Sequence, residues 1–157
     1  MKVNEEVVAL LAAQGKTIAT AESCTGGLLA KLITDVSGAS AVFGYGIVSY
    51  ANEIKWGQLG VKRETVERFG AVSEQTAREM AQCARRNAAA DIGIATTGIA
   101  GPTGGTAEKP NGTCFVGFCD GESTLVKKIN TGLSDRDKNR QLFAEAALQL
   151  VKDKLNE

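Results

Sequence analysis

The stretch Thr20-Ala21-Glu22-Ser23-Cys24-Thr25-Gly26-Gly27 decides how the first part of the chain folds. It follows a short apolar run, residues 17–21, that is typical of a buried strand, and it precedes apolar side chains at helical spacing from Leu28 to Val36. A strand that ends directly before a helix lies beside backbone amides that have no partner inside that helix. The turn therefore places a carboxylate, small nucleophilic side chains and two glycines at a ready-made anion site.

The rest of the chain first repeats this alternation of helices and strands. Helical spacing and capping residues predict helices at residues 2–14, 25–38, 52–58, 63–69, 73–88 and 135–155. Apolar runs bounded by turn residues predict strands at residues 17–21, 41–51, 92–96, 113–119 and 123–131. The last helix should bury one face, which is formed by Leu142, Phe143, Ala146, Ala147, Leu150, Val151 and Leu155.

This order of elements predicts an α/β fold, namely a three-layer α/β/α sandwich with a mixed β-sheet. The first strands alternate with helices, as in parallel sheets, and the last two strands meet at the tight turn Asp120-Gly121. No internal repeat, linker or low-complexity segment interrupts the pattern. We therefore expect residues 1–157 to form a single domain.

The composition of the chain indicates which partners it lacks and where in the cell we expect it. Lys+Arg and Asp+Glu balance at 18 each, and aromatic residues make up 5% of the chain, so no electrostatic footprint for nucleic acid or a membrane surface exists. No run of about 18 apolar residues is present, and the first residues are too acidic and too few for a signal peptide. We expect a cytoplasmic protein with no nucleic-acid or membrane partner.

The chain contains no histidine, which restricts its chemistry. A Ser-His-Asp triad cannot form within one chain, and zinc sites that use imidazole are excluded. The four cysteines, Cys24, Cys83, Cys114 and Cys119, include no C-x-x-C pair, so we expect reduced thiols and no metal site. An activated hydroxyl would need another base, and lysine is the obvious candidate.

Ser23 and Lys55 are the two candidates for this chemistry. Ser23 lies where a strand meets a helix, which is where open α/β sheets gather ligands, although Ser23 and Thr25 are equally suited to cap the helix. Lys55 follows a strand and is flanked by Ile54 and Trp56. Burial would lower the pKa of its ammonium and leave an amine that accepts a proton, whereas a lysine on a short helix is ordinarily solvated.

Two further segments offer ligand contacts. The glycine-rich run 97–105 follows a buried strand and opens a long loop, so Thr97 again places a hydroxyl at a strand end and the glycines offer amide donors; a mobile hairpin tip is the alternative. Arg136 opens the last helix and Arg140 follows one turn later; each could reach a phosphate or pair with a nearby acid. Tyr50 could stack on a flat ligand or fill the strand.

Six motifs in order resemble one family. They are Ala-Glu-Ser-Cys-Thr-Gly-Gly (21–27), Tyr-x-Asn-Glu-x-Lys (50–55), Gly-Ala-Val-Ser-Glu (70–74), Thr-Gly-Ile-Ala-Gly-Pro-x-Gly-Gly (97–105), Lys-Pro-x-Gly-Thr (109–113) and Asp-Arg-Asp (135–137). The chain is similar in this way to the CinA C-terminal domain family, whose stand-alone members include the PncC nicotinamide-nucleotide amidohydrolases. The chain has no room for the additional N-terminal domain of full-length CinA proteins, so it resembles a single-domain form.

The resemblance implies an activity and a set of site residues. The implied reaction is hydrolysis of the carboxamide of nicotinamide mononucleotide (NMN) to nicotinate mononucleotide and ammonia, without a cofactor. The implied catalytic residues are Ser23, Lys55 and Thr97. The expected substrate contacts are Thr25, Gly26, Gly27, Tyr50, Gly98, Gly101, Arg136 and Arg140.

Three points stay open at the level of sequence. Cys24 is a rival nucleophile, because a helix end can lower the pKa of its thiol. The glycine loops would serve a non-catalytic nucleotide-binding or regulatory module equally well, and an amidase acting on another small carboxamide would use the same reacting groups. A homodimer is expected from the resemblance, and a stripe of alanines on the helix 73–88 would permit close packing.

Overall fold

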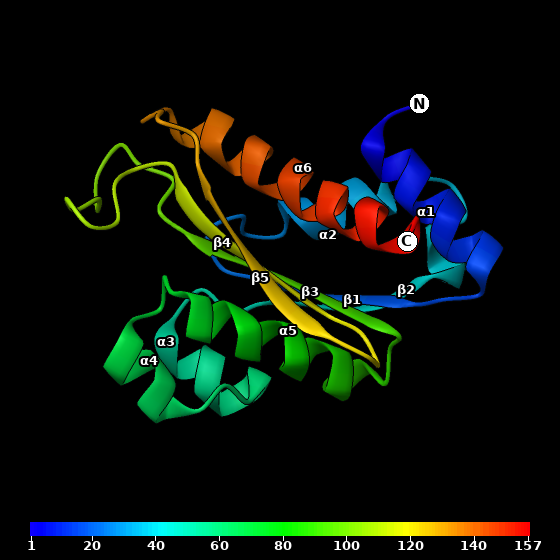
Figure 1. Cartoon of the computed structure of the whole chain (residues 1–157), viewed down its shortest axis with the longest axis horizontal. Coiled ribbons are helices and arrows are strands. Elements are labelled where there is room, and N and C mark those ends of the chain that lie inside the picture. Colours follow the sequence, from blue (N-terminus) through cyan, green and yellow to red (C-terminus); the bar gives the residue numbers. More distant parts are fainter.

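A five-stranded mixed sheet forms the centre of the molecule, in the order β2-β1-β3-β4-β5 (Figure 1). The computed structural model describes all 157 residues. The strands are β1 (Ile18–Glu22), β2 (Phe43–Val48), β3 (Ile92–Gly98), β4 (Thr113–Cys119) and β5 (Thr124–Asn130). β1 runs parallel to β2 and β3, whereas β4 is antiparallel to both β3 and β5. The predicted mixed sheet is therefore confirmed.

Helices cover both faces of the sheet and complete the predicted three layers (Figure 1). They are α1 (Val3–Gln14), α2 (Leu28–Thr34), α3 (Asn52–Ile54), α4 (Arg63–Phe69), α5 (Glu74–Ala88) and α6 (Arg136–Leu155), with a 3-10 turn η1 (Ala39–Ala41) and a π-helical turn η2 (Lys55–Leu59). α1, α2 and α6 lie on one face, and α3, α4 and α5 lie on the other. No helix is both long enough and apolar enough to cross a membrane.

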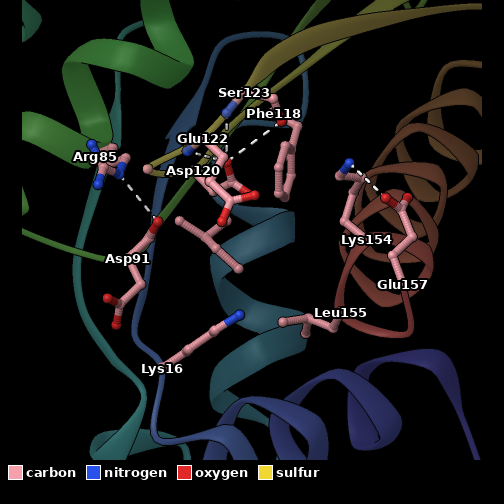
Figure 2. Close-up of a pocket in the computed structure, with 12 residues that line it drawn as sticks. Lys16, Arg85, Asp91, Phe118, Asp120, Glu122, Ser123, Lys154, Leu155 and Glu157 are labelled. Carbon is pink, nitrogen blue, oxygen red and sulfur yellow. Dashed lines mark hydrogen bonds and ion pairs between the residues drawn. The ribbon is translucent and has the colours of Figure 1, made fainter.

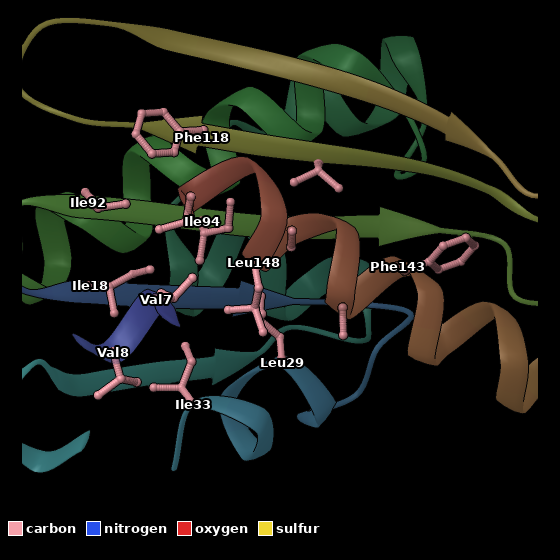
Figure 3. Packing of buried hydrophobic residues seen from close by; sticks show 14 of the residues in the cluster. Val7, Val8, Ile18, Leu29, Ile33, Ile92, Ile94, Phe118, Phe143 and Leu148 are labelled. Carbon is pink, nitrogen blue, oxygen red and sulfur yellow. The ribbon is translucent and has the colours of Figure 1, made fainter. Parts of the chain in front are cut away.

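The larger hydrophobic core lies between the sheet and the layer of α1, α2 and α6 (Figure 3). Branched side chains from β1 and β3, such as Ile18 and Ile94, meet Leu148 of α6 there. The buried face of α6 includes Ala144 and Leu148, whereas Leu142 and Ala146, which the sequence pattern placed on that face, are half-buried. The helix is therefore rotated slightly from the predicted orientation, because α1 and α2 also pack against it.

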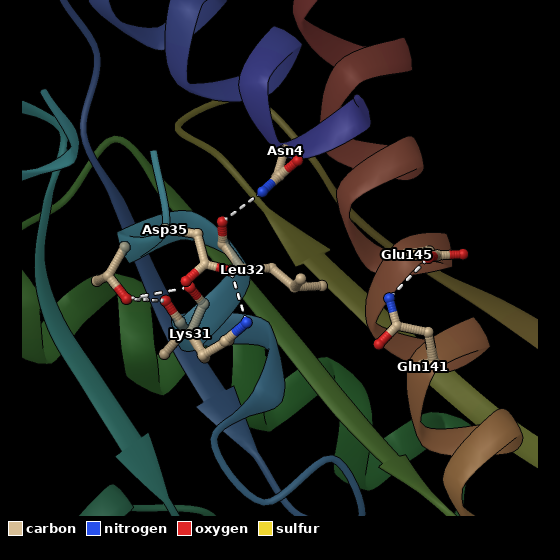
Figure 4. A network of polar contacts seen from close by, with 8 residues as sticks. Asn4, Lys31, Leu32, Asp35, Gln141 and Glu145 are labelled. Carbon is tan, nitrogen blue, oxygen red and sulfur yellow. Dashed lines mark hydrogen bonds and ion pairs between the residues drawn. The ribbon is translucent and has the colours of Figure 1, made fainter. Parts of the chain in front are cut away.

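A polar contact joins α1 to α2 in this layer, and others run along single helices (Figure 4). The side-chain amide of Asn4 in α1 donates to the Leu32 carbonyl of α2 at 2.8 Å. Lys31 and Asp35 form an ion pair along α2 at 2.7 Å. The contact through Asn4 holds α1 against α2, and so supports the helix that follows the Ser23 turn.

The opposite layer depends on small residues. Ala77 and Ala81 of α5 face the sheet, and a Cβ atom added at Gly117 or Gly93 would collide with their backbone carbonyls. α5 therefore approaches β3 and β4 at a distance that only glycine allows. The alanine stripe lies against the chain's own sheet, so it gives no support to the expected homodimer.

This close approach predicts the effect of adding one methyl group. Gly117→Ala should lower the free energy of unfolding by about 1–3 kcal/mol, because α5 has to move away from the sheet. Gly44→Ala on β2 is the matched control, because a Cβ there meets no atom within 4 Å. Urea denaturation of both variants checks the prediction. Equal stability of the two variants would contradict the packing described here.

Candidate active site

The ends of three parallel strands form the site. Register pairs Glu22 of β1 with Val48 of β2 and with Thr96 of β3. The chain continues this pairing by one residue, since the amide of Ser23 donates to Thr96 O at 3.0 Å and the amide of Ser49 donates to Glu22 O at 2.8 Å. Ser23 is therefore fixed in the middle of this edge, between the residues that follow β2 and those that end β3.

The Glu22 carboxylate caps α2. It is 1% exposed, and it accepts hydrogen bonds from the Thr25 hydroxyl at 2.6 Å and from the amides of Gly27, Leu29 and Ala30 at 3.2, 2.8 and 3.1 Å. These are the amides that a helix leaves without internal partners. The anion site expected at this helix end is therefore occupied by the chain's own carboxylate, in the position that favours negative charge.

Thr25, Gly26 and Gly27, which were expected to contact substrate, form the frame of the turn. Gly26 N donates to Ser23 O at 3.0 Å, and the Thr25 hydroxyl also bonds Thr96 Oγ1 at 2.7 Å. Gly26 and Gly27 have φ angles of +59° and +105°, which side chains disfavour. The turn thus uses these groups internally, and their contact with a substrate stays a prediction.

Lys55 reaches Ser23 from the face of the sheet that carries α3, opposite to the face that carries α2. It begins the π-helical turn η2 and is 1% exposed. Its Nζ donates to Ser49 O at 2.6 Å, to Tyr50 O at 3.2 Å and to Ser23 Oγ at 3.1 Å. No carboxylate pairs with it. The structure therefore brings together the two residues that the sequence singled out.

The environment of Lys55 makes its neutral form more accessible than that of a solvated lysine. Burial lowers the pKa of the ammonium from 10.5 to about 8, because the buried group loses the hydration that stabilises its charge. The neighbouring Cys24 thiol opposes this shift by raising the pKa. At neutral pH a small but usable fraction of the molecules therefore carries an uncharged amine.

The geometry also directs the lone pair of that amine. Carbonyl oxygens accept hydrogen bonds and cannot donate them. A neutral amine that keeps its two N–H bonds to Ser49 O and Tyr50 O has only its lone pair left for the third partner, which is Ser23 Oγ. The Ser23 hydroxyl then donates to Lys55 Nζ, as a hydroxyl about to lose its proton must.

Thr97 lies at the same sheet edge but is turned away from this pair. It is fully buried, and its hydroxyl donates to Ala71 O at 2.7 Å, in the segment that leads into α5. It makes no hydrogen bond to Ser23 or Lys55. The geometry thus gives Thr97 no contact with the Ser23–Lys55 pair, and the catalytic role implied by the resemblance stays a prediction.

A cavity of about 240 Å³ opens at Ser23. Its lining combines the Ser23 turn, the segment after β2, the end of β3 with the loop after it, and the first residue of α6. The residues are Ser23, Cys24, Tyr50, Gly98, Ile99, Ala100, Gly101, Thr103, Gly104 and Arg136. Four of the expected substrate contacts, Tyr50, Gly98, Gly101 and Arg136, lie in this lining. No acidic side chain is among the residues, so Arg136 gives the cavity a positive wall.

The two arginines of α6 have different positions. Arg136 donates to Gly101 O at 2.9 Å and to the Tyr50 hydroxyl at 3.0 Å, and so joins two walls of the cavity. Arg140 does not line the cavity; it donates to Cys24 O at 3.1 Å and Thr25 O at 2.9 Å. Of the two expected phosphate contacts, the structure places only Arg136 at the cavity.

Backbone amides beside Ser23 remain available to a ligand. The amides of Cys24, Ala100 and Gly101 donate to no protein atom, although these three residues are buried and line the cavity. Sequence reasoning had assigned the amide donors to both glycine loops. In the structure they come from the residue after Ser23 and from the loop after β3.

A larger hollow of about 430 Å³ lies at the other end of the sheet (Figure 2). Its charged groups are largely engaged in local contacts: Arg85 bonds Asp91 O at 3.1 Å, and Lys154 pairs with Glu157 at 3.0 Å. The Ser123 hydroxyl donates to the Asp120 carboxylate there at 3.4 Å, but the same carboxylate oxygen accepts the amides of Glu122 and Ser123 at 2.8 Å each and so holds the β4–β5 turn. This contact therefore serves the turn, and the hollow is not the candidate site. No group of three or more His, Cys, Asp or Glu side chains is placed to hold a metal ion, and all four cysteines are free and buried.

The sequence did not reveal several groups that hold Lys55 and the Ser23 turn in place. The carbonyls of Ser49 and Tyr50, which orient Lys55, carry no side-chain signal, because backbone atoms are the same at every residue. The capping role of Glu22 had a signal, since a carboxylate a few residues before a helical run is suited to its first turn.

Comparisons with known proteins identify the family of the chain. The family model of the CinA C-terminal domain matches residues 1–155. A putative competence-damage inducible protein of Thermoanaerobacter sp. (strain X514) is 54% identical over 151 residues, which cover 96% of this chain and 36% of that protein. A CinA-like protein of Kosmotoga olearia is 53% identical, with the same coverage of 96% and 36%. The chain thus spans about a third of the length of these curated relatives.

Solved structures match over nearly the whole chain. The competence/damage inducible protein CihA from Agrobacterium tumefaciens has a TM-score of 0.94 and 38% identity, covering 99% of this chain and 94% of that one. The competence damage-inducible protein A (ComA) from Klebsiella pneumoniae has a TM-score of 0.94 and 34% identity, with coverage of 99% and 96%. On the strength of these matches, the chain belongs to the CinA C-terminal domain family.

Proposed function

We propose that this domain hydrolyses the carboxamide of NMN, with Ser23 as nucleophile and the neutral amine of Lys55 as its base. The observation that carries the proposal is the 3.1 Å contact between Lys55 Nζ and Ser23 Oγ, in which two backbone carbonyls take the other hydrogen bonds of the amine. A lysine that served only the fold would gain more from a carboxylate partner or from solvent. The resemblance of the motifs to nicotinamide-nucleotide amidohydrolases supports the choice of substrate.

The first half of the reaction forms an acyl-enzyme. Lys55 takes the hydroxyl proton while Ser23 Oγ bonds the amide carbon, and the carbonyl oxygen becomes an oxyanion. The amides of Cys24 and of the loop residues Ala100 and Gly101 are the available donors for that oxyanion. Lys55 then gives its proton to the nitrogen as the C–N bond breaks, and ammonia leaves.

The second half regenerates the enzyme. Water attacks the Ser23 ester and gives a proton to Lys55, and Ser23 Oγ recovers that proton as the C–O bond to it breaks. The products are nicotinate mononucleotide and ammonia, and one water is consumed. The neutral amine serves as base in both halves, so no histidine is needed.

The cavity fits one end of the substrate. Its volume of about 240 Å³ lies below the range typical of sites that enclose a whole ligand, so it would hold the pyridine ring and leave the ribose phosphate at the mouth. Tyr50, which is 59% exposed, offers its ring to the flat pyridinium. Arg136 is exposed beside it and offers a guanidinium to the phosphate.

Ammonia release from pure protein tests the reaction and the nucleophile. A panel of small carboxamides, with NMN and its dephosphorylated riboside among them, identifies the substrate. Ser23→Ala should lower kcat by about 10⁴-fold or more, because the acyl-enzyme cannot form, whereas Cys24→Ala should retain most activity. Both variants change one buried or half-buried side chain by a single atom, so each serves as the control for the other.

Each contrary result points to a different alternative. Full activity of Ser23→Ala together with an inactive Cys24→Ala would make the thiol the nucleophile. NMN binding detected by calorimetry without ammonia release from any carboxamide would favour a nucleotide-binding or regulatory module. Release from another carboxamide but not from NMN would keep the mechanism and overturn the substrate.

The buried amine can also be tested without substrate. The pKa of Lys55 is about 8 in the folded chain against 10.5 when exposed, so the unfolded chain binds more protons between these pH values. The stability of the wild type relative to Lys55→Met should therefore rise by up to about 3 kcal/mol between about pH 7 and pH 10. Urea denaturation at both pH values measures it, with the exposed Lys62→Met as control. A difference that is independent of pH would contradict the lowered pKa.

A further inference from the structure

Arg140 is an arginine without an acidic partner beside the Ser23 turn. It is half-buried on the first turns of α6, and none of the ion pairs in the structure involves it. Its hydrogen bonds go to two backbone carbonyls instead, from Nε to Cys24 O at 3.1 Å and from Nη2 to Thr25 O at 2.9 Å. Its guanidinium therefore binds the turn beside the nucleophile without a carboxylate at ion-pair distance.

The Thr25 carbonyl is linked to the amide of Cys24 through two planar peptides, whereas the Cys24 carbonyl belongs to the peptide between them, which carries the Thr25 N–H. In a trans peptide the C=O and the N–H point in opposite directions, so fixing one fixes the other. The Nη2 contact fixes the peptide of Thr25 and Gly26, whose N–H donates to Ser23 O at 3.0 Å. That bond fixes the peptide of Ser23 and Cys24, which lies earlier in the turn. The N–H of this peptide belongs to Cys24, a residue that lines the cavity, and it has no acceptor in the protein.

Glu22 holds the same turn from the other side. Its carboxylate accepts the amides of Gly27, Leu29 and Ala30, while Arg140 takes the carbonyls of Cys24 and Thr25. An anion thus engages the donors of the turn and a cation engages its acceptors. Only the amides of Cys24 and Thr25 are left over, and the amide that follows a nucleophilic serine is where hydrolases of another fold place an oxyanion donor.

We propose that Arg140 is a positioning residue: by holding the Cys24 and Thr25 carbonyls, it aims the amide of Cys24 at the oxyanion formed during attack by Ser23. The inference rests on the proposed function for the nucleophile, but not on NMN as the substrate. It gives Arg140 a different task from the phosphate contact expected from the sequence. Its charge adds to the effect through a chain of hydrogen bonds. It polarises the Thr25–Gly26 peptide, so the Gly26 N–H is a stronger donor to Ser23 O, and that bond polarises the peptide that carries the Cys24 N–H.

The test compares Arg140→Ala and Arg140→Lys with Lys138→Ala, an exposed cation on the same helix whose side chain makes no hydrogen bond or ion pair. Two reactions are followed. For ammonia release from NMN, kcat and KM are measured, and for labelling of Ser23 by a fluorophosphonate, the rate is measured. In the labelling reaction Ser23 Oγ bonds phosphorus, fluoride leaves and Lys55 takes the proton. This second rate needs the oxyanion donor but no carboxamide substrate.

Arg140→Ala should lower kcat and the labelling rate by about 10-fold or more and leave KM within about 2-fold, because a misdirected oxyanion donor affects the transition state and not substrate binding. Free guanidinium ion should restore part of both rates. Arg140→Lys keeps the charge but cannot hold two carbonyls, so it should be intermediate. Lys138→Ala should match the wild type. Melting temperatures show whether each variant is folded.

The contrary outcomes are distinct. A folded Arg140→Ala that labels at the wild-type rate, or one whose defect lies only in KM, overturns the inference. Labelling that depends on Arg140 in a protein that releases no ammonia from NMN supports the inference and removes the proposed substrate. If the wild type is not labelled at Ser23 at all, no activated serine exists, and both proposals fail.

Discussion

The burial of Lys55 without an acidic partner is the constraint on which the site depends. A buried ammonium normally needs a carboxylate, yet Nζ meets two carbonyls and the Ser23 hydroxyl. The carbonyls belong to Ser49 and Tyr50, which directly follow β2, and Ser49 is itself held by Glu22 O of β1. The pairing of two parallel strands thus sets the distance between Lys55 Nζ and Ser23 Oγ. In the proposed mechanism this arrangement takes the place of an imidazole, since backbone carbonyls would orient the base as a third side chain does in a histidine triad.

The turn that carries Ser23 is also held by hydrogen bonds to both its amides and its carbonyls. Its amides are held by Glu22 and its carbonyls by Arg140, so a chain segment of a few residues has partners of both signs from β1 and from α6. Such a turn can present a serine and a free amide in one orientation without paying for their reorganisation during the reaction. The start of α6 contributes a second time, because Arg136 joins Tyr50 to Gly101 across the mouth of the cavity. The C-terminal helix therefore closes a site whose candidate reacting groups, Ser23 and Lys55, come from the first 55 residues of the chain.

Much of this could be predicted from the sequence. The strands and helices were located to within a few residues, and α4 and β4 coincide with the predicted ranges, because apolar periodicity and glycine or capping residues mark them clearly. The approach of Ser23 to Lys55 was also expected.

The direction in which side chains point could not be predicted. Periodicity cannot show that Arg140 bends toward the Cys24 carbonyl or that Thr97 turns to Ala71 O. These two contacts join segments far apart in the chain, which local periodicity does not reveal. The Glu22 cap is local by contrast: its carboxylate had a signal in the sequence, but the glycines beside it favoured a free anion site.

The central claim is that one neutral lysine activates one serine. The most direct test is the pH dependence of kcat/KM for ammonia release from NMN, measured for the wild type and for Lys55→Ala. The wild-type rate should rise with pH and level off above a midpoint near the pKa of about 8, because only the uncharged amine accepts the proton. Lys55→Ala should lose about 10²-fold or more of the activity and lose this rise with it. A wild-type profile that is flat across this range, or a rise that persists unchanged in Lys55→Ala, would contradict the account.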